Sequence, residues 1–150
     1  MAAMDGLTAA NPQFEQVTRA MFAGQPFMAY IGAELAAVAP GYAEIRLPFK
    51  PEVTQHNGYF HGGVIATLAD NSGGAAGYTL LPPGKALLTV ELKINLLAPG
   101  RGELLIARGR VLRHGRSLVV GAAEVFAVED GRESLCASEL MTLMVVDRRD

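Results

Sequence analysis

The chain has 150 residues, half of them hydrophobic, and a net charge of −2 with acidic and basic residues mixed along its length. This size and composition fit one globular domain, over residues 1–150, with a sizeable core. No lysine or arginine cluster suggests nucleic-acid binding, and the apolar runs are too short to span a bilayer. We therefore expect a partner that is neither nucleic acid nor membrane.

Two features of the sequence indicate the compartment. Residues 1–6 lack the basic and apolar segments of a secretory signal, so we expect no leader. The single cysteine, Cys136, lies in an apolar strand-like run and is expected to be a small core residue. Because a lone cysteine cannot form an internal disulfide, a reducing cytoplasm is the default location.

The first third of the chain predicts a helix followed by a β-hairpin. Residues 12–23 have apolar side chains at helical spacing, and residues 1–26 are expected to form an N-terminal helical extension. Residues 28–38 and 42–49 alternate between apolar and other side chains, with a Pro40-Gly41 turn signal between them. These two segments are predicted to pair as antiparallel strands.

Residues 61–80 have the pattern of a long, mostly apolar helix. The residues of its predicted core stripe follow helical spacing: Ile65, Leu68, Ala69, Ser72 and Ala76. Another face holds Asp70 among small residues, namely Ala66, Gly73, Gly74 and Gly77. Glycine inside a helix costs about 1 kcal/mol relative to alanine. We therefore expect another element to approach this face closely.

The remainder of the chain predicts four strands joined by tight turns, at residues 86–97, 103–113, 117–128 and 133–146. The third is apolar on both faces, which is typical of a central strand, and Asp130-Gly131 is a hairpin signal. Strands joined by tight turns are antiparallel. An antiparallel sheet of five to six strands around one long central helix gives an α+β domain.

The strongest chemical signal lies at the start of the long helix. Glycines in His61-Gly62-Gly63 leave backbone N–H groups free to face a ligand oxygen. Asp70 follows in the same helix, although a buried helix normally excludes an unpaired carboxylate because of its desolvation cost. An oxyanion-binding turn and a carboxylate in one segment suggest acyl chemistry.

From about Phe27 to Val146 the chain resembles the PaaI-like, phenylacetate-pathway type of acyl-CoA thioesterase, in the hotdog-fold 4-hydroxybenzoyl-CoA thioesterase superfamily. The resemblance rests on Gly58-Tyr59-Phe60-His61-Gly62-Gly63, Leu68-Ala69-Asp70, the strand at 89–95, and Gly115-Arg116-Ser117-Leu118. In such enzymes the sheet wraps around the long helix, and two subunits join into a continuous sheet. The resemblance implies active sites at the interface of a homodimer, with a dimer of dimers as the expected larger assembly. The second subunit is then expected to approach the glycine face of the long helix.

The resemblance also implies roles for individual residues. The Gly62 amide binds the thioester carbonyl, and Asp70 of the partner subunit acts as general base or nucleophile. Thr89 falls where relatives carry a Ser or Thr that helps to hold the attacking water. Relatives often have Asn where this chain has Gln55, which keeps the amide on a longer arm. Asn57 is nearby but two positions out of register.

Some of these residues have simpler alternatives. Gly62 and Gly63 could merely permit a tight turn, and Asp70 could cap an element or pair with an arginine such as Arg46. His61 is a candidate general base, but we prefer a role in which its ring orients the glycine turn through a hydrogen bond.

Other candidates have equally simple alternatives. Thr89 lies on the predicted polar face of its strand, where threonine is common for its β-propensity alone. Arg113 and Arg116 flank a turn and could contact CoA phosphates or could simply be solvated charges. Tyr59 and Phe60 could line the acyl pocket or pack at the dimer interface.

The sequence as a whole predicts an acyl-CoA thioesterase that releases a free acid and CoA and needs no cofactor. The three histidines do not combine with carboxylates at the spacing of metal ligands, so no metal is implied. The residues expected to bind substrate are Asn57, Gly63, Tyr59, Phe60, Arg113 and Arg116. Two rivals are a hotdog acyl-thioester dehydratase or hydratase, with His61 and Asp70 as its acid–base pair, and a non-catalytic acyl-CoA-binding protein. The acyl group stays open.

Overall fold

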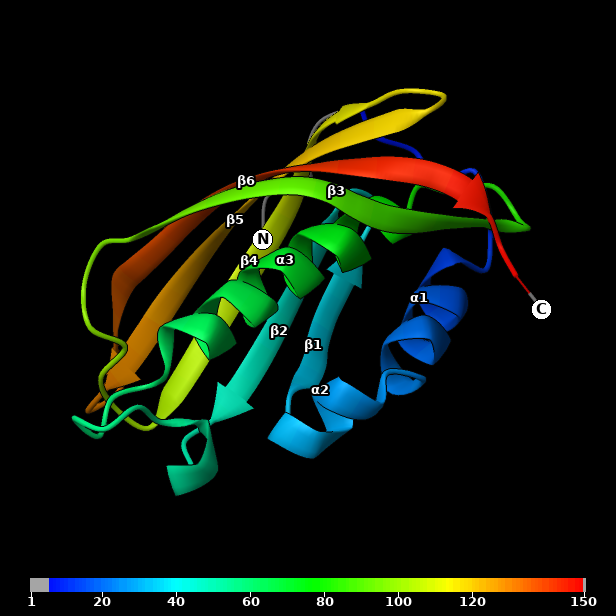
Figure 1. Ribbon diagram of the computed structural model, residues 1–150. Helices are drawn as coiled ribbons and strands as arrows, with labels where there is room; N and C mark the ends of the chain where they lie inside the picture. Colours follow the sequence, from blue (N-terminus) through cyan, green and yellow to red (C-terminus); the bar gives the residue numbers. More distant parts are fainter. Residues whose placement is uncertain (1–5, 150) are drawn as a thin grey trace.

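The computed structural model describes residues 6–149, which form one six-stranded antiparallel sheet curved around a long helix (Figure 1). The helices are α1 (Phe14–Ala23), α2 (Pro26–Ile31), the short 3-10 helix η1 (Pro51–Val53) and α3 (Gly62–Tyr78). The strands are β1 (Glu34–Ala39), β2 (Tyr42–Pro48), β3 (Lys85–Leu96), β4 (Leu104–His114), β5 (Leu118–Glu129) and β6 (Arg132–Asp147). The expectation about a leader falls, except for Gly6, on residues outside this range.

The strand order is β1-β2-β4-β5-β6-β3, so β1 and β3 form the two edges of the sheet. Helix α3 crosses the concave face and contacts every strand of the sheet (Figure 1). The predicted α+β hotdog architecture, with its helix and strands in the expected order, is thereby confirmed, and the sheet has six strands.

The core lies between α3 and the concave face of the sheet. All five residues of the predicted helix stripe are buried there. Where α3 crosses β4, a Cβ on Gly109 would overlap the backbone of Ser72 and Gly73. Helix and sheet therefore touch backbone to backbone at Gly109, and this contact determines how closely α3 approaches the sheet.

The expectation that the helix glycines face a second subunit is wrong for two of the three. Gly73 and Gly77 are buried within the chain itself. A Cβ on Gly73 would overlap Met141, and a Cβ on Gly77 would lie 2.8 Å from a methyl group of Leu87. Gly74, by contrast, has open space around it. The small residues at two of these positions are needed because the chain's own strands β3 and β6 pass close to α3.

The strand predicted over residues 28–38 begins later than expected. Residues 26–31 form α2, and β1 begins at Glu34 and pairs with β2 as the predicted hairpin. Pro26 occupies the first turn of α2, where its missing N–H carries no penalty, and Gly32 ends the helix at φ 83°. The proline and the glycine at the two ends favour a helix here, and their effect outweighs the alternation of apolar side chains that favours a strand.

The N-terminal helices belong to the same hydrophobic core. Phe22 of α1, and Met28 and Ile31 of α2, are buried in the cluster formed by α3 and the sheet. Cys136 is buried as expected, and burial raises the pKa of its thiol to about 11. Within residues 6–149 no helix is both long enough and apolar enough to cross a membrane.

Candidate active site

The turn that opens α3 leaves one backbone donor free. The Gly63 amide donates a 2.9 Å hydrogen bond to Nδ1 of His61, and the amides of Val64 and Ile65 donate to the His61 carbonyl. Within residues 6–149 the Gly62 amide has no hydrogen-bond partner. It is therefore a free donor at the positive end of the helix. The ring of His61 orients the glycine turn, in agreement with its preferred role.

Gly62 lines a cavity of about 470 Å³ between the loop before α3 and the β3–β4 connection. We call it the amide pocket. Its other lining residues are Gln55, Asn57, Tyr59, Phe60, Ile65, Leu96, Leu97, Ala98, Pro99 and Gly100. The structure thus brings together five of the predicted site residues around one free amide.

Gln55 is held so that its amide nitrogen can donate. Its side-chain oxygen accepts a hydrogen bond from the Asn57 backbone amide, and its own backbone bonds to Gly58 and Tyr59. Since the side-chain oxygen is occupied, the NH₂ group is the part of the amide left for a ligand carbonyl. Asn57 supports this arrangement through its backbone.

Tyr59 and Phe60 occupy different positions in the amide pocket. Phe60 is only 2% exposed, and its ring packs edge-on against Phe49 with 5.5 Å between centroids. Phe60 is therefore a core residue that also lines the amide pocket, and its contact with the acyl group or with a second subunit stays a prediction. Tyr59 lies at the rim, where its hydroxyl accepts a 2.8 Å hydrogen bond from Arg101.

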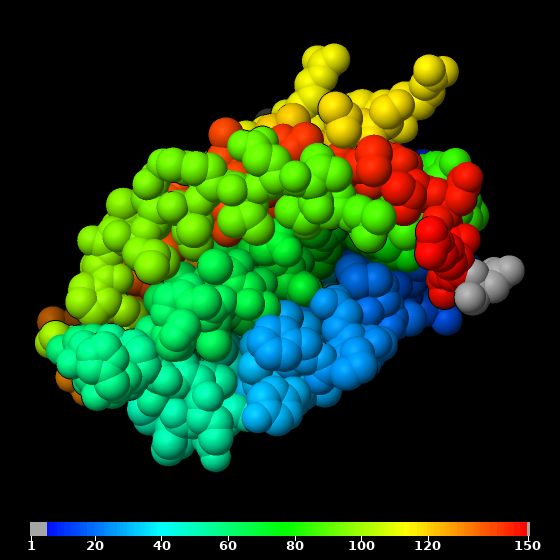
Figure 2. Space-filling view, in the orientation of Figure 1, coloured from blue at the N-terminus to red at the C-terminus, as the bar shows by residue number. Residues whose placement is uncertain are grey.

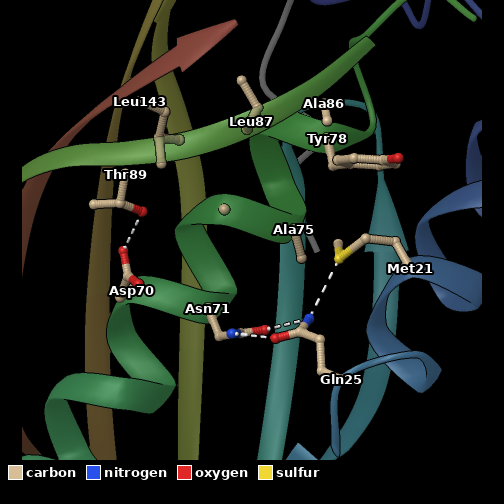
Figure 3. A pocket seen from close by; sticks show the side chains of 11 residues that line it. Met21, Gln25, Asp70, Asn71, Ala75, Tyr78, Ala86, Leu87, Thr89 and Leu143 are labelled. Atoms are coloured by element: carbon tan, nitrogen blue, oxygen red, sulfur yellow. Dashed lines mark hydrogen bonds between the residues drawn. The ribbon is translucent and has the colours of Figure 1, made fainter. Parts of the chain in front are cut away.

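A β-bulge turns Thr89 toward Asp70. The pairing of β3 with β6 shifts by one residue between Thr89 and Glu91, which leaves Val90 as the extra residue. Thr89 consequently faces α3 while Glu91 faces outward, although strict alternation would put both on one side. The expectation that Thr89 lies on the polar outer face is therefore wrong. Its Oγ1 donates to Asp70 Oδ1 at 2.8 Å (Figure 3).

The environment of Asp70 makes it a stronger base than an ordinary aspartate. Burial raises the pKa of its carboxyl, and the hydrogen bond from Thr89 opposes this rise by stabilising the ionised form. A raised pKa brings a carboxylate closer to the basicity that a general base needs at neutral pH. Asp70 therefore combines a fixed orientation with increased basicity.

Asp70 and Thr89 line a second cavity, of about 260 Å³, between α3, β3 and α1. We call it the carboxylate pocket. Figure 2 shows the surface hollowed between β3 and the N-terminal helices, with α3 behind. The pocket extends from Asp70 past further residues of α1, the α1–α2 loop, α3, β3 and β6: Met21, Gln25, Asn71, Gly74, Ala75, Tyr78, Ala86, Leu87 and Leu143.

Gln25 and Asn71 join the N-terminal helices to α3 inside the carboxylate pocket. Their side-chain amides exchange two hydrogen bonds, of 2.8 and 3.2 Å (Figure 3). Sequence reasoning missed both residues, because they are 46 positions apart and belong to no motif. The only available signal is that Asn71 directly follows Asp70.

The two pockets share no lining residue. Gly62 and Asp70 are eight residues apart in α3, which corresponds to about 12 Å along the helix axis. A carbonyl oxygen within about 3 Å of the Gly62 amide would therefore lie well away from the Asp70 of the same chain. Each chain therefore carries two separate pockets, one with the free Gly62 amide and one with the Asp70 carboxylate.

Arg113 and Arg116 lie outside both pockets. They flank the β4–β5 turn, which is drawn in yellow and projects beyond the body of the sheet (Figure 1). Neither forms an ion pair within the described range of residues 6–149. Their contact with CoA phosphates stays a prediction.

Comparison with known proteins identifies the family. The profile of the Thioesterase superfamily matches residues 57–134, which is more than half of the chain. The chain belongs to the Thioesterase superfamily. It is similar in structure to a thioesterase family protein from Silicibacter pomeroyi, with a TM-score of 0.88 and 37% identity, covering 90% of this chain and 99% of that one.

Curated members of the Thioesterase superfamily are also similar in sequence. A putative esterase of Saccharolobus solfataricus is 34% identical over 77% of this chain and 75% of its own length. The 1,4-dihydroxy-2-naphthoyl-CoA hydrolase of Listeria monocytogenes is 29% identical over 79% of this chain and 94% of its own length. The protein is thus an enzyme that hydrolyses thioesters. Gly62, Asp70 and Thr89 all lie within the matched segment.

In the part of the chain that the structure describes, no three His, Cys, Asp or Glu side chains are grouped as metal ligands would be. That the enzyme needs neither metal nor cofactor stays a prediction of the sequence.

Proposed function

We propose that this thioesterase hydrolyses an acyl-CoA to a free acid and CoA at a site shared by two subunits. The observation that carries the proposal is the free Gly62 amide at the start of α3. A fixed backbone donor is what a thioester carbonyl needs as negative charge develops on its oxygen. The name of the Listeria relative, a hydrolase of a CoA thioester, supports CoA as the carrier.

In the proposed site, one subunit polarises the carbonyl. The Gly62 amide and the side-chain NH₂ of Gln55 donate to the carbonyl oxygen, and the positive end of α3 adds a favourable field. His61 keeps the turn in place by accepting the Gly63 amide, which leaves the Gly62 amide for substrate. These donors keep their positions during the reaction, so they stabilise the oxyanion without rearrangement.

Asp70 of the partner subunit supplies the negative charge on the other side of the carbonyl. It either takes a proton from an attacking water or attacks the carbonyl carbon itself, and both routes need its ionised form. Collapse of the tetrahedral intermediate breaks the C–S bond and releases CoA as the thiolate. When water is the nucleophile, this collapse gives the free acid directly. When Asp70 is the nucleophile, it leaves an acyl–Asp70 anhydride, which water then hydrolyses to the free acid and the Asp70 carboxylate. Thr89 orients the carboxylate and, in the water route, the attacking water. The acyl group lies in the carboxylate pocket.

The exposed edge of β3 supports pairing of two subunits. Four apolar side chains of this edge strand are 41–57% exposed: Leu88, Val90, Leu92 and Leu96. A long apolar edge strand is avoided in monomers because it invites pairing. Thr89 lines the carboxylate pocket and Leu96 the amide pocket. Antiparallel pairing of two β3 strands about their middle therefore brings each carboxylate pocket to the amide pocket of the other chain, so that each pocket is a half-site of the active site.

A second apolar surface supports a dimer of dimers. Leu88, Met144 and Leu118 are register partners across β3, β6 and β5, and all three are at least 40% exposed on the outer face of the sheet. Burying this row against the same row of a second dimer satisfies two-fold symmetry. Light scattering should give a tetramer for the wild type and a dimer for Met144→Asp.

A panel of acyl-CoAs with a thiol-detecting reagent tests the proposed reaction. The panel should include aryl-acetyl, medium-chain and short branched acyl groups, since the sequence does not identify the acyl group. Release of free CoA is the expected result. Hydration of crotonyl-CoA without thiol release would instead establish a hydratase, and tight binding without turnover would establish a binding protein.

A further inference from the structure

Glu139 of β6 has a carboxyl group that takes no part in the reaction proposed above. Its side chain faces α3 and is 2% exposed, and neither carboxyl oxygen has a hydrogen-bond partner within residues 6–149. An isolated ionised carboxylate away from water is strongly disfavoured. The group is therefore disposed to stay protonated, and its presence in the core needs a reason beyond packing.

The register between β6 and α3 places Glu139 beside the catalytic carboxylate. Met141 of β6 meets α3 at Gly73, and Leu143 lies next to Gly77. Two residues along a strand span about 6.6 Å and four residues along a helix about 6 Å, so successive inward-facing residues of β6 meet successive turns of α3. Glu139 comes two residues before Met141. It therefore faces the turn of α3 four residues before Gly73, at Ala69, which is adjacent to Asp70.

Other charges on the neighbouring elements point away from Glu139. Its register partners on β3 and β5 are uncharged, namely Ile94 and Ala123. The next charged residues on those strands, Lys93 and Glu124, pair with the outward-facing residues on either side of Glu139. Asp70 is the single charged residue of α3, and its charge acts on the Glu139 carboxyl.

We propose that Glu139 is a positioning residue of the thioesterase, a buried carboxyl partner that stays protonated while Asp70 is ionised and that strengthens Asp70 as a base when it ionises itself. The inference rests on the proposed function, which makes Asp70 the base or nucleophile. Two carboxyls close together and away from water do not both ionise easily. Asp70 ionises first because Thr89 donates to it, whereas Glu139 has no donor in the described chain.

The pKa values support this order. Burial and, secondly, the charge of Asp70 raise the pKa of Glu139 to about 7. Burial also raises the pKa of Asp70, but the Thr89 hydrogen bond opposes that rise. Above neutral pH a charged Glu139 therefore appears beside an already ionised Asp70. Repulsion between the two favours any step in which Asp70 takes up a proton or forms a bond, so the rate rises.

The pH dependence of kcat/KM tests this role, with the acyl-CoA of the panel that is hydrolysed fastest. Between about pH 6 and about pH 8 the wild type should gain roughly threefold in rate. Glu139→Gln and Glu139→Met should lack this gain and keep the acid limb set by Asp70. Glu124→Gln, on the outer face of the adjacent strand, is the matched control and should keep the gain. Identical profiles in the wild type and both Glu139 variants would overturn the proposal.

A titration without substrate separates this inference from the proposed function. The ¹³C NMR signal of the Asp70 carboxyl should titrate in two steps in the wild type, the second near the Glu139 pKa of about 7, and in one step in Glu139→Gln. Two titration steps in a protein that hydrolyses no acyl-CoA would support the carboxyl pair and refute the proposed function. A single step in the wild type would refute the pair, whatever the activity.

Discussion

Thr89 Oγ1 donates a 2.8 Å hydrogen bond to Asp70 Oδ1, and a strand irregularity makes this bond possible. The extra residue Val90 moves Thr89 from the outer to the inner side of β3. The bond stabilises the ionised carboxylate in a half-buried place, where burial alone favours the protonated form. The bulge therefore contributes to the chemistry of the site as well as to the shape of the sheet.

Thr89→Val should make Asp70 harder to ionise. Valine keeps the shape of threonine but removes the hydroxyl, so the pKa of Asp70, already raised by burial, should rise further. Because the carboxylate acts in its ionised form, the loss of kcat/KM on acidification should begin at a higher pH in the variant. A pH–rate profile measures this shift, and Thr142→Val on the outer face of β6 is the control. An unmoved acid limb would show that the hydroxyl does not influence Asp70.

Asp70→Asn should lower kcat by at least about 100-fold, because an amide is neither a base nor a nucleophile at neutral pH. Asparagine has nearly the same size, and Asp70 lies at a pocket wall, so the melting temperature and the assembly state should stay near those of the wild type. Thiol release, thermal unfolding and light scattering give the three readings. Turnover close to that of the wild type would mean that another group supplies the base.

Gly62→Pro should remove the carbonyl donor without breaking α3. Gly62 is the first helical residue, where proline is tolerated, and the preceding His61 has the extended conformation that proline requires (φ −63°, ψ 135°). We expect kcat to fall roughly 100- to 1000-fold. Gly62→Ala is the control, since it brings a Cβ to the same methyl group of Leu96 but keeps the N–H. Equal losses in the two variants would show that crowding, and not the donor, is responsible.

Local signals predicted most of the fold. Helical spacing identified α3 and its core stripe, and Asp130-Gly131 marked the β5–β6 turn, where both residues have positive φ. The tight turns between β1 and β2, β4 and β5, and β5 and β6 indicated antiparallel pairs, as the sheet has them. The connection from β3 to β4 gave no such guide, because it joins strands that are not neighbours and β3 pairs with β6 instead. The glycine turn at Gly62 was also recognisable, since two successive glycines at a helix start are a local signal of exposed backbone N–H groups.

The features that sequence reasoning missed depend on contacts between distant segments. The bulge before Glu91 breaks a regular alternation, and nothing in the local pattern indicates where the extra residue falls. Gln25 and Asn71 meet only because α1 packs beside α3. The burial of Glu139 had a readable signal, because it alternates with Ala137 and Met141 on the inner side of β6. A carboxylate among the inward-facing apolar residues of a strand is unusual, and the alternation in the sequence shows it.

Gly74→Leu should change acyl preference, whereas Gly73→Ala should reduce stability. Gly74 has open space and lines the carboxylate pocket, so a leucine there should lower kcat/KM for bulky acyl groups and leave acetyl-CoA nearly unaffected. Gly73 faces Met141 within the core, and overpacking of this kind typically costs about 1–3 kcal/mol. Thermal unfolding should show this loss of stability in Gly73→Ala, and the acyl-CoA panel should show the changed preference in Gly74→Leu. Equal kcat/KM losses for all acyl groups in Gly74→Leu would place the acyl chain elsewhere.

Mixed dimers test whether each active site combines two chains. In a purified heterodimer of Gly62→Pro and Asp70→Asn chains, one of the two sites receives both wild-type groups if the half-sites come from different subunits. Such a heterodimer should therefore recover about half of the wild-type activity, although each parent homodimer is inactive.

The matched control pairs a wild-type chain with a chain that carries both substitutions. A site shared between subunits predicts that this second heterodimer is nearly inactive, because each of its sites then lacks one group. A site within one chain predicts the reverse, with the first heterodimer inactive and the second retaining half of the activity. About 12 Å of α3 separates Gly62 from Asp70 in one chain, so we expect activity in the first heterodimer and not in the second.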